Sequence, residues 1–540
     1  MNEVDLINVP FTARESRLLL FHDKNGYRVQ LAESYFTYET QTPLHHIQIV
    51  GAQPPETLPF AVQAGQTQWI FTKPEVLLLH SKTSAISFML EGQHQFIVQG
   101  GQASGEININ YAIQPEPQSK EFHDGQITLG WHKDTKITIA FAIKRGEINA
   151  VSEYNFEDEF EQVKTNWLKW QKAIPALSEN VPMYDYAWWL MDVNRIRNYA
   201  HPERLAMSPS KLHYVGCWLW DAYFHAIAYR HHSPAIAKEQ LRTMIDHQQA
   251  DGMLPDVIHD GGIITESTDY VEGKVTKPPL LAWTAWKIYE VDSDIGFLEE
   301  TYAHAVDSQA WWLNECDQDG NGLYEYTHPY SSGLDDNPLF DGGVPLESPD
   351  LNAYLIMQAD TLAQIAELLG KPDSAMWREQ AETITNRLIE QRWNPELGLF
   401  DAVRNNEVVP VRTPFQLLPL LTGRLPESIR NRMVQTLKDP TQFWGKYGVP
   451  TVAFDDPLFN ASQMWRGPIW LNVHYLLIEG LKRSGFPDVA QELRQKSLTL
   501  INHSGHIAEY YNPLIGQKSP KAIDMFGWSA ALYVDMLINK

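Results

Sequence analysis

The sequence predicts a mainly α-helical protein in which an (α/α)6 toroid follows an N-terminal antiparallel β-sandwich. Over roughly the first 150 residues, short apolar runs alternate with Gly, Pro, Asn or Asp, which is typical of a sandwich. After Pro182, about twelve segments with helical spacing of apolar residues follow in short-looped pairs, as six inner and six outer helices require. We therefore predict three parts, which are an accessory β-sandwich domain at 1–155, a linker helix at 156–181 and a barrel domain at 182–540.

Composition and charge limit the class of protein. Of the 540 residues, 44% are apolar and 20% charged, which is typical of a globular chain. The net charge, 43 − 67 = −24, disfavours nucleic acid and anionic lipid and favours a small or neutral partner. The start of the chain has no basic residues before an apolar run, no run of 18 apolar residues occurs, and the two cysteines have no metal-ligand spacing. We expect a cytoplasmic protein without a signal peptide.

The predicted strands begin with a hairpin. Residues 18–21 and 27–31 flank Lys24-Asn25-Gly26, which is a strong turn signal. Further strands are expected at 46–50, 69–72, 76–80, 85–90, 95–98, 107–111, 127–131 and 137–143. Because these runs contain no set of residues suited to catalysis, we interpret this part as an accessory domain.

Helices are predicted from apolar periodicity and from their end signals. Ser348-Pro349 begins one of them and Gly370-Lys371-Pro372 ends it. The twelve segments lie near 182–200, 216–231, 233–249, 278–291, 295–315, 349–369, 371–391, 413–422, 426–437, 467–484, 486–503 and 526–538. An open solenoid of helical hairpins is the alternative, but no fixed sequence period supports it.

Five loop motifs place polar and aromatic side chains near predicted helix starts. The two longest loops, 250–277 and 316–348, should lie on the functional face of a toroid. The motifs are Trp218-Leu219-Trp220-Asp221, Asp251–Asp256 with Thr276-Lys277-Pro278-Pro279, Ser332-Gly333-Leu334-Asp335-Asp336-Asn337-Pro338, Met464-Trp465-Arg466-Gly467-Pro468-Ile469-Trp470, and Glu509-Tyr510-Tyr511-Asn512-Pro513 with Gly527-Trp528. Aromatic rings beside carboxylates suit sugars, whose C–H faces stack on rings while their hydroxyls need polar partners.

Each motif also has a purely structural interpretation. The helix dipole alone explains an acid such as Asp221 in a first turn. Asp335, Asp336 and Asn337 are ordinary turn residues. The guanidinium of Arg466 can donate two hydrogen bonds to the hydroxyls or carboxylate of a ligand, or it can make a structural ion pair within the protein.

Taken together, the motifs resemble the clan of (α/α)6 glycosidases that contains glycoside hydrolase families 63 and 37. The Trp-Asp-x-x-Phe pattern matches Trp220, Asp221 and Phe224, and the Ser-Gly-x-Asp pattern matches residues 332–335. The Lys-Pro-Pro, Trp-Arg-Gly-Pro-Ile-Trp and Glu-Tyr-x-x-Pro patterns follow the same order in the chain, at 277–279, 465–470 and 509–513. The similarity covers residues 185–540.

This resemblance implies hydrolysis of an α-glycoside with inversion, for which one carboxyl donates a proton and an opposed carboxylate activates water. It implies Asp335 as the general acid and Glu509 as the general base. The implied substrate-binding residues are Trp218, Trp220, Asp221, Lys277, Trp465, Arg466 and Trp528. Neither step requires a metal or an organic cofactor, and the expected partner is a small carbohydrate.

Two departures from the clan pattern leave questions open. Clan members often have Ser-Gly-x-Asp-Asn-Ser-Pro, so a one-residue deletion would make Asp336 the acid, whereas the spacing from Gly333 and Pro338 favours Asp335. Lys277 stands where trehalases have Gln, which disfavours a trehalase. An added positive charge suits an acidic aglycone such as glycerate, as a hypothesis.

One further motif, Asp317-Gln318-Asp319-Gly320-Asn321-Gly322, looks like the start of a calcium loop. Its twelfth position is His328 instead of the required Glu, so a polar turn is favoured.

The sequence as a whole predicts an inverting exo-α-glycosidase, of α-glucosidase type, for a small disaccharide or a glucosyl- or mannosylglycerate. The alternatives are a glycoside phosphorylase on the same toroid and a non-catalytic carbohydrate-binding protein. Linkage, aglycone, glucose versus mannose and oligomeric state are left open.

Overall fold

A computed structural model describes the strands between residues 18 and 140 and then residues 168–181, 183–198, 201–259 and 261–539, with a few single positions before 166. The chain forms two compact units. The first comprises 1–176, 184–198 and 207–215, and the second comprises 177–183, 199–206 and 216–540. The domain boundaries at 155 and 182 stay predictions. Among the described helices, none is both long and apolar enough to cross a membrane.

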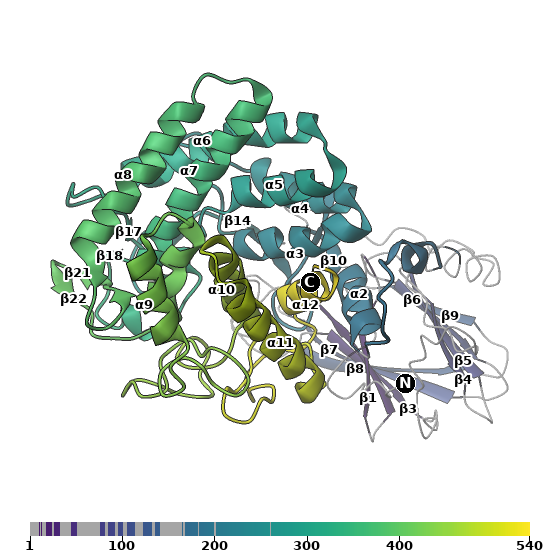
Figure 1. Ribbon diagram of the computed structural model, residues 1–540. Helices are drawn as coiled ribbons and strands as arrows, with labels where there is room; N and C mark the ends of the chain where they lie inside the picture. The colour runs from purple at the N-terminus through teal and green to yellow at the C-terminus, as the bar shows by residue number, and fades with distance from the viewer. Residues whose placement is uncertain are drawn as a thin grey trace. The chain divides into compact units, whose positions relative to one another are not determined.

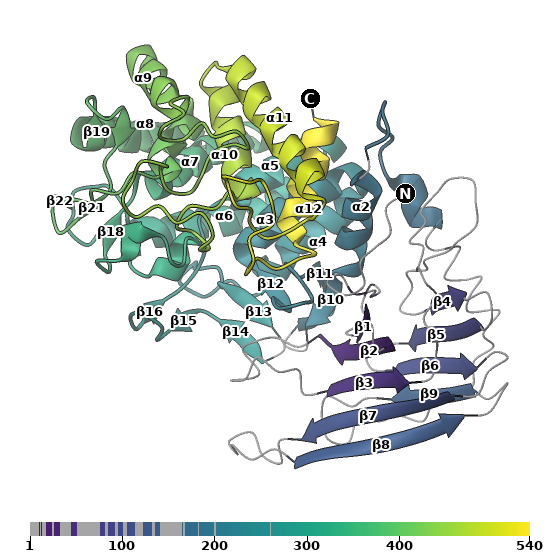
Figure 2. The same cartoon turned by 90° about the horizontal axis from the view of Figure 1, so that it is seen from below.

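The first unit contains two antiparallel sheets, with strand orders β1-β2-β3-β7-β8 and β4-β5-β6-β9 (Figure 2). The strands are β1 Leu18–Asp23, β2 Gly26–Leu31, β3 His45–Val50, β4 Val76–His80, β5 Ala85–Glu91, β6 Gln95–Gly100, β7 Gly105–Ile113, β8 His123–Trp131 and β9 Lys136–Ala140. The predicted hairpin is confirmed, because Asp23 pairs with Gly26 across a two-residue turn. The predicted strand at 69–72 lies outside the described residues, and the packing of the sheets as a sandwich stays a prediction.

Two helical segments of the first unit are described, and the second of them is shorter than predicted. Residues 168–173 are helical within the predicted linker, and α2 spans Tyr184–Val193. The prediction of one helix over 182–200 is wrong beyond residue 193, because Arg195–Asn198 forms strand β10. The carbonyl oxygen of Asn194 accepts hydrogen bonds from the Ser208 amide (3.0 Å) and hydroxyl (3.1 Å) instead of continuing the helical ladder.

Six helices of the second unit form a closed ring, each contacting the next, with the last returning to the first (Figure 1). In five of them the side chains are buried on nearly all faces, as expected of inner helices, whereas α5 is buried mainly in its first half. They are α3 Leu219–His232, α5 Leu281–Asp292, α7 Pro349–Leu369, η4 Pro414–Thr422, α10 Leu471–Arg483 and α12 Gly527–Ile538. Ring closure confirms the predicted toroidal arrangement of the inner helices and excludes an open solenoid.

A second layer of helices covers this ring. Helix α4 contacts α3 and α5, α6 contacts α5 and α7, α8 contacts α7, α9 contacts η4, and α11 contacts α10 and α12. These outer helices span Pro234–Ile245, Ile295–Glu315, Ser374–Arg392, Glu427–Leu437 and Pro487–Ser504, respectively. The predicted segment at 413–422 is a 3-10 helix rather than an α-helix, because Pro419 lies inside it and lacks the amide that an α-helical turn needs.

The two long loops of the second unit contain short strands that the sequence did not predict. The first carries β13 Val257–His259, β14 Gly262–Ile264, β15 Glu266–Ser267 and β16 Gly273–Lys274. The second carries β17 Glu325–Tyr326, the 3-10 turns η2 Pro329–Ser332 and η3 Pro338–Phe340, and β18 Leu346–Glu347. Short pairings of this kind fix the loops that connect one helix pair to the next.

Candidate active site

Polar side chains from several loops meet at the N-terminal ends of the inner helices. Asp221 lies in the first turn of α3, and Lys277 lies shortly before α5. The ammonium of Lys277 lies 2.6 Å from the Asp256 carboxylate and donates to the Tyr330 carbonyl oxygen at 2.6 Å. Asp221 interacts electrostatically with Lys277, Asp256 and Glu509, so loops separated by nearly 300 residues of sequence converge here.

Asp335 follows η2 and has the properties of a proton donor. Burial raises the pKa of its carboxyl to about 6. The positive charge of Lys277 opposes this shift, whereas the negative charges of Asp256 and Asp336 add to it. Within the described part of the chain, only its own backbone amide bonds to this carboxyl, which leaves the group available to a ligand.

The carboxylate of Asp336, the neighbouring acid, is hydrogen-bonded to other residues of the protein. Its two oxygens accept hydrogen bonds from the Trp465 amide at 2.8 Å and from the Gln463 side chain at 3.1 Å. These bonds oppose the upward pKa shift that burial gives this carboxyl. Asp336 therefore fastens the loop before α10 to the loop that carries Asp335.

Arg466 makes further contacts between the same two loops. Its guanidinium forms a bidentate pair with Asp341 at 2.8 and 2.7 Å and donates to the Asp336 carbonyl oxygen at 3.0 Å. The sequence left open whether Arg466 binds a ligand or makes a structural ion pair, and this geometry is that of a structural ion pair.

Glu509 lies in the loop between α11 and α12 and is 3% exposed. Its Oε2 accepts a hydrogen bond from the Ile523 amide at 3.2 Å, and its own amide donates to the Ile523 carbonyl oxygen at 2.8 Å. This two-way pairing holds the side chain against the strand-like segment that follows.

A stack of indole rings lies beneath these carboxyls. Trp465 stacks on Trp470 with ring centres 3.7 Å apart and faces Trp220 at 6.2 Å, while Trp528 meets all three rings edge-on. Trp220 and Trp465 are each 1% exposed. Gly333 has a positive φ of 71°, and a Cβ there would lie 1.8 Å from the Trp220 ring. The turn before Asp335 thus rests directly on the ring of Trp220.

Some polar atoms of this cluster are buried without a hydrogen-bond partner among the described residues. They are Oδ1 of Asp221 and the indole N–H groups of Trp220 and Trp528. Burial raises the pKa of Asp221 well above its ordinary value, with Lys277 opposing this shift and the charge of Glu509 adding to it. Trp218, which ends β12 (Gly216–Trp218), is also buried. A buried polar atom without a protein partner can be satisfied by a bound ligand or by water.

The sequence did not identify Asp256 as a site residue. The motif 251–256 was noted, but only the fold shows that its last residue pairs with Lys277. In the calcium-like motif, Asp317, Asp319 and Asn321 accept hydrogen bonds from nearby backbone amides, as in a polar turn, and the Asn321 side chain also donates to Glu347 at 2.9 Å. No group of three or more His, Cys, Asp or Glu suited to a metal occurs among the residues that the structure describes.

Comparison with known proteins identifies the family. Residues 214–529, more than half of the chain, match the family model of the mannosylglycerate hydrolase MGH1-like glycoside hydrolase domain. The chain therefore belongs to this family, within glycoside hydrolase family 63, and is a glycoside hydrolase.

Two curated relatives and one solved structure show the extent of the similarity. The mannosylglycerate hydrolase of Rubrobacter radiotolerans is 25% identical over 406 residues, which cover 60% of this chain and 90% of the relative. The glucosylglycerate hydrolase of Mycolicibacterium hassiacum is 24% identical over 416 residues, covering 60% and 92%. The family 63 mannosylglycerate hydrolase of Thermus thermophilus, solved in complex with glucose, has a TM-score of 0.57 at 22% identity and covers 66% of this chain and 99% of that one. This structure supports the fold.

Proposed function

We propose that the protein is an inverting α-glycosidase that hydrolyses a small α-glycoside, with Asp335 as general acid and Glu509 as general base. The observation that carries the proposal is the contrast between the two neighbouring acids. Asp336 is bonded to the Trp465 amide, whereas Asp335 is half-buried, has a pKa raised to about 6 and receives no hydrogen bond from another described residue. A carboxyl with this pKa keeps part of its proton near neutral pH.

In the proposed reaction, Asp335 gives its proton to the glycosidic oxygen as the bond between that oxygen and the anomeric carbon breaks. Glu509 takes a proton from the water that attacks the anomeric carbon from the opposite face. The hydrogen bond from the Ile523 amide orients the Glu509 side chain for this step. The sugar is released with inverted configuration, and proton exchange with solvent restores both carboxyls.

The unpaired polar atoms suit the hydroxyls of the sugar. We propose that Oδ1 of Asp221 and the indole N–H groups of Trp220 and Trp528 bind the glycone, since each of these atoms is buried and has no hydrogen-bond partner among the described residues. Lys277 and Trp218 complete the proposed set. Trp465 and Arg466 contribute by holding the loop of Asp335 through Asp336 and Asp341.

The charges of the site favour an uncharged aglycone over glycerate. The positive charge of Lys277, which suggested an acidic aglycone, is neutralised by Asp256 at 2.6 Å. The charge of Arg466 is likewise matched by Asp341. Because Asp336 and Glu509 add negative charge, an anionic leaving group would be repelled at this position. The substrate class that follows is a neutral disaccharide or a glycosylglycerol.

A matched pair of substrates tests this preference. Glucosylglycerol and glucosylglycerate differ only in a hydroxymethyl group in place of a carboxylate, and the mannosides form a second pair. We expect kcat/KM for the glycerol compound to exceed that for the glycerate compound by about 10-fold, which corresponds to about 1.4 kcal/mol. Asp256→Asn should narrow this ratio, because it frees the charge of Lys277. Preference for the glycerate compounds would contradict the neutral aglycone but leave the hydrolase mechanism standing.

Product stereochemistry tests the mechanism itself. With an α-glycoside as substrate, proton NMR during the first minutes of turnover should show the β-anomer of the sugar before mutarotation supplies the α-anomer. Early release of the α-anomer would instead indicate retention and a nucleophilic carboxylate. Turnover should persist in phosphate-free buffer, which a glycoside phosphorylase would not allow.

A further inference from the structure

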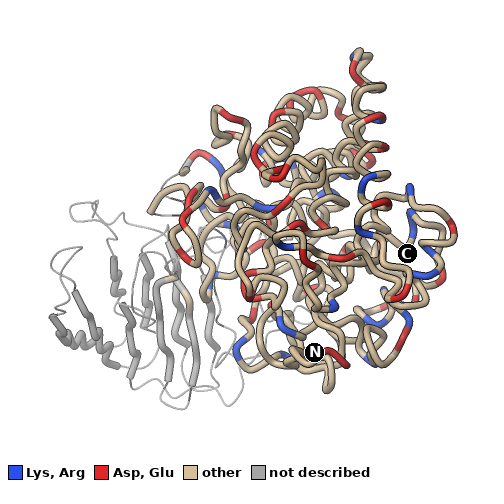
Figure 3. The backbone as a smooth tube through the Cα atoms, turned by 90° about the vertical axis from the view of Figure 1, so that its left-hand side faces the viewer, with Lys and Arg blue, Asp and Glu red and all other residues tan. Residues whose placement is uncertain are grey.

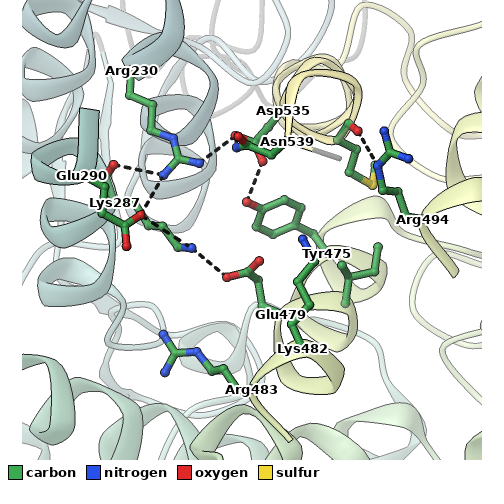
Figure 4. Close-up of a pocket in the computed structure, with 12 residues that line it drawn as sticks. Arg230, Lys287, Glu290, Tyr475, Glu479, Lys482, Arg483, Arg494, Asp535 and Asn539 are labelled. Atoms are coloured by element: carbon green, nitrogen blue, oxygen red, sulfur yellow. Dashed lines mark hydrogen bonds and ion pairs between the residues drawn. The ribbon is translucent and has the colours of Figure 1, made fainter. Parts of the chain in front are cut away.

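A cavity of about 460 Å³ lies at the opposite end of the helical ring from the candidate active site. The site is formed at the N-terminal ends of α3, α5, α10 and α12, whereas the cavity is lined by residues near the C-terminal ends of the same helices (Figure 4). Helices of 12 to 14 residues separate the two places by roughly 20 Å. The cavity is therefore a distinct feature of the fold.

Cations outnumber carboxylates around this cavity. The lining contains Arg230, Lys287, Lys482, Arg483 and Arg494 against Glu290, Glu479 and Asp535. An excess of positive charge at one place is unusual in a chain whose net charge is −24. Figure 3 shows basic and acidic segments intermixed around the C-terminus of the chain.

The carboxylates of the lining are already bonded to other groups. Asp535 accepts hydrogen bonds from Arg230 at 3.0 Å, from Tyr475 at 2.8 Å and from Asn539 at 2.9 Å. The ammonium of Lys287 lies 2.9 Å from Glu479. Asp535 and Glu479 are thus each in contact with a cation already, although Glu479 and Glu290 also act electrostatically on Arg483, and Asp535 on Arg494.

Three cations of the lining have no carboxylate within 4 Å among the described residues. Lys482 and Arg483 are exposed at the end of α10 and form no ion pair there. Arg494 is 5% exposed, and its guanidinium donates to the Met536 carbonyl oxygen at 2.5 Å and to the Gln491 side chain at 3.4 Å.

Helix ends explain part of this pattern. The C-terminal end of a helix carries partial negative charge, and basic side chains stabilise it. Arg230 donates to the Lys287 carbonyl oxygen at 3.0 Å, and Arg494 bonds to a carbonyl of α12 in the same way. Lys482 and Arg483 make no such bond to any residue that the structure describes, although they belong to the last turn of α10.

We propose that this cavity binds a small phosphate-bearing anion, with Lys482, Arg483 and Arg494 as its cationic partners. Guanidinium groups match the geometry of phosphate oxygens, and an ammonium adds a point charge. The volume lies within the range of small-molecule sites, about 300–1,000 Å³, so a phosphate monoester with a small organic group fits. Ile478, Met536 and the ring of Tyr475 supply apolar surface for that group.

Binding of inorganic phosphate to the full-length protein tests the proposal by isothermal titration and thermal unfolding, with chloride at equal ionic strength as reference. The test variant is Lys482→Gln/Arg483→Gln, which removes two exposed cations without ion-pair partners, so its fold should be unchanged. The matched control is Arg378→Gln/Lys438→Gln, which removes two exposed cations paired with Glu367 and Glu492 outside the cavity.

Phosphate is expected to bind the wild-type and control proteins with the same Kd and to raise their Tm. The test variant should bind at least about 10-fold more weakly. Methyl phosphate, the smallest monoester, should compete with phosphate for the wild-type protein. Equal affinity in the wild-type and test variants would place phosphate elsewhere and overturn the proposal. Absence of binding to the wild-type protein would overturn it as well and leave the cations as stabilisers of helix ends.

Discussion

The Asp335→Asn variant is expected to hydrolyse an unactivated α-glycoside about 10³-fold more slowly than the wild-type protein, because asparagine has no acidic proton to give to the leaving oxygen. KM should change little, since the two side chains have nearly the same size. The measurement is release of glucose or mannose at neutral pH, together with Tm as a check of folding. A substrate with a good leaving group, such as a nitrophenyl α-glycoside, needs no proton and should recover much of the lost rate.

The Asp336→Asn variant is the matched control. The side-chain carbonyl oxygen of the asparagine can still accept the hydrogen bond from the Trp465 amide, although the contact to Gln463 is weakened. We expect kcat to fall less than about 10-fold and Tm to decrease slightly, as for loss of one partly buried hydrogen bond. If Asp336→Asn abolished turnover and Asp335→Asn spared it, the assignment of the acid would be reversed.

The Glu509→Gln variant is expected to lose turnover by about 10³-fold for a different reason, because glutamine cannot take a proton from the attacking water. The Gln side chain can still accept the hydrogen bond from the Ile523 amide, so folding and sugar binding should persist. Binding of the product sugar by titration is the control for an intact site. An activated leaving group should not restore this variant, since water activation remains impaired. Recovery to within about 10-fold of the wild-type rate would remove Glu509 from the role of base.

Much of the fold is predictable from the sequence because it depends on local periodicity and end signals. The helix predicted at 349–369 is observed with these bounds, beginning at Pro349 and ending before Gly370. Gly370 adopts a left-handed conformation, which glycine reaches without strain because it has no Cβ. The prediction of a helix over 182–200 is wrong beyond residue 193, because Ser208, 14 residues further along the chain, bonds to the Asn194 carbonyl oxygen. The short strands of the two long loops were missed because pairings of two or three residues leave no period to detect.

For the candidate site, the sequence by itself determined which motifs carry polar and aromatic residues, their order along the chain and the clan they resemble. Only the tertiary structure decided how neighbouring acids differ. In the sequence, only the spacing from Gly333 and Pro338 favours Asp335 over Asp336. In the structure, the Trp465 amide, 129 residues after Asp336, bonds to Asp336 and leaves Asp335 open.

The tertiary structure also decided the charge of the site. In the sequence, the positive charge of Lys277 suggested an acidic ligand, but in the structure Lys277 is paired with Asp256. Arg466 was a candidate for substrate binding, but its guanidinium is paired with Asp341. The physical reason is the same in each case. Periodicity and turn chemistry act over a few residues and can be read along the chain, whereas pKa and charge depend on the groups that folding brings within a few ångströms.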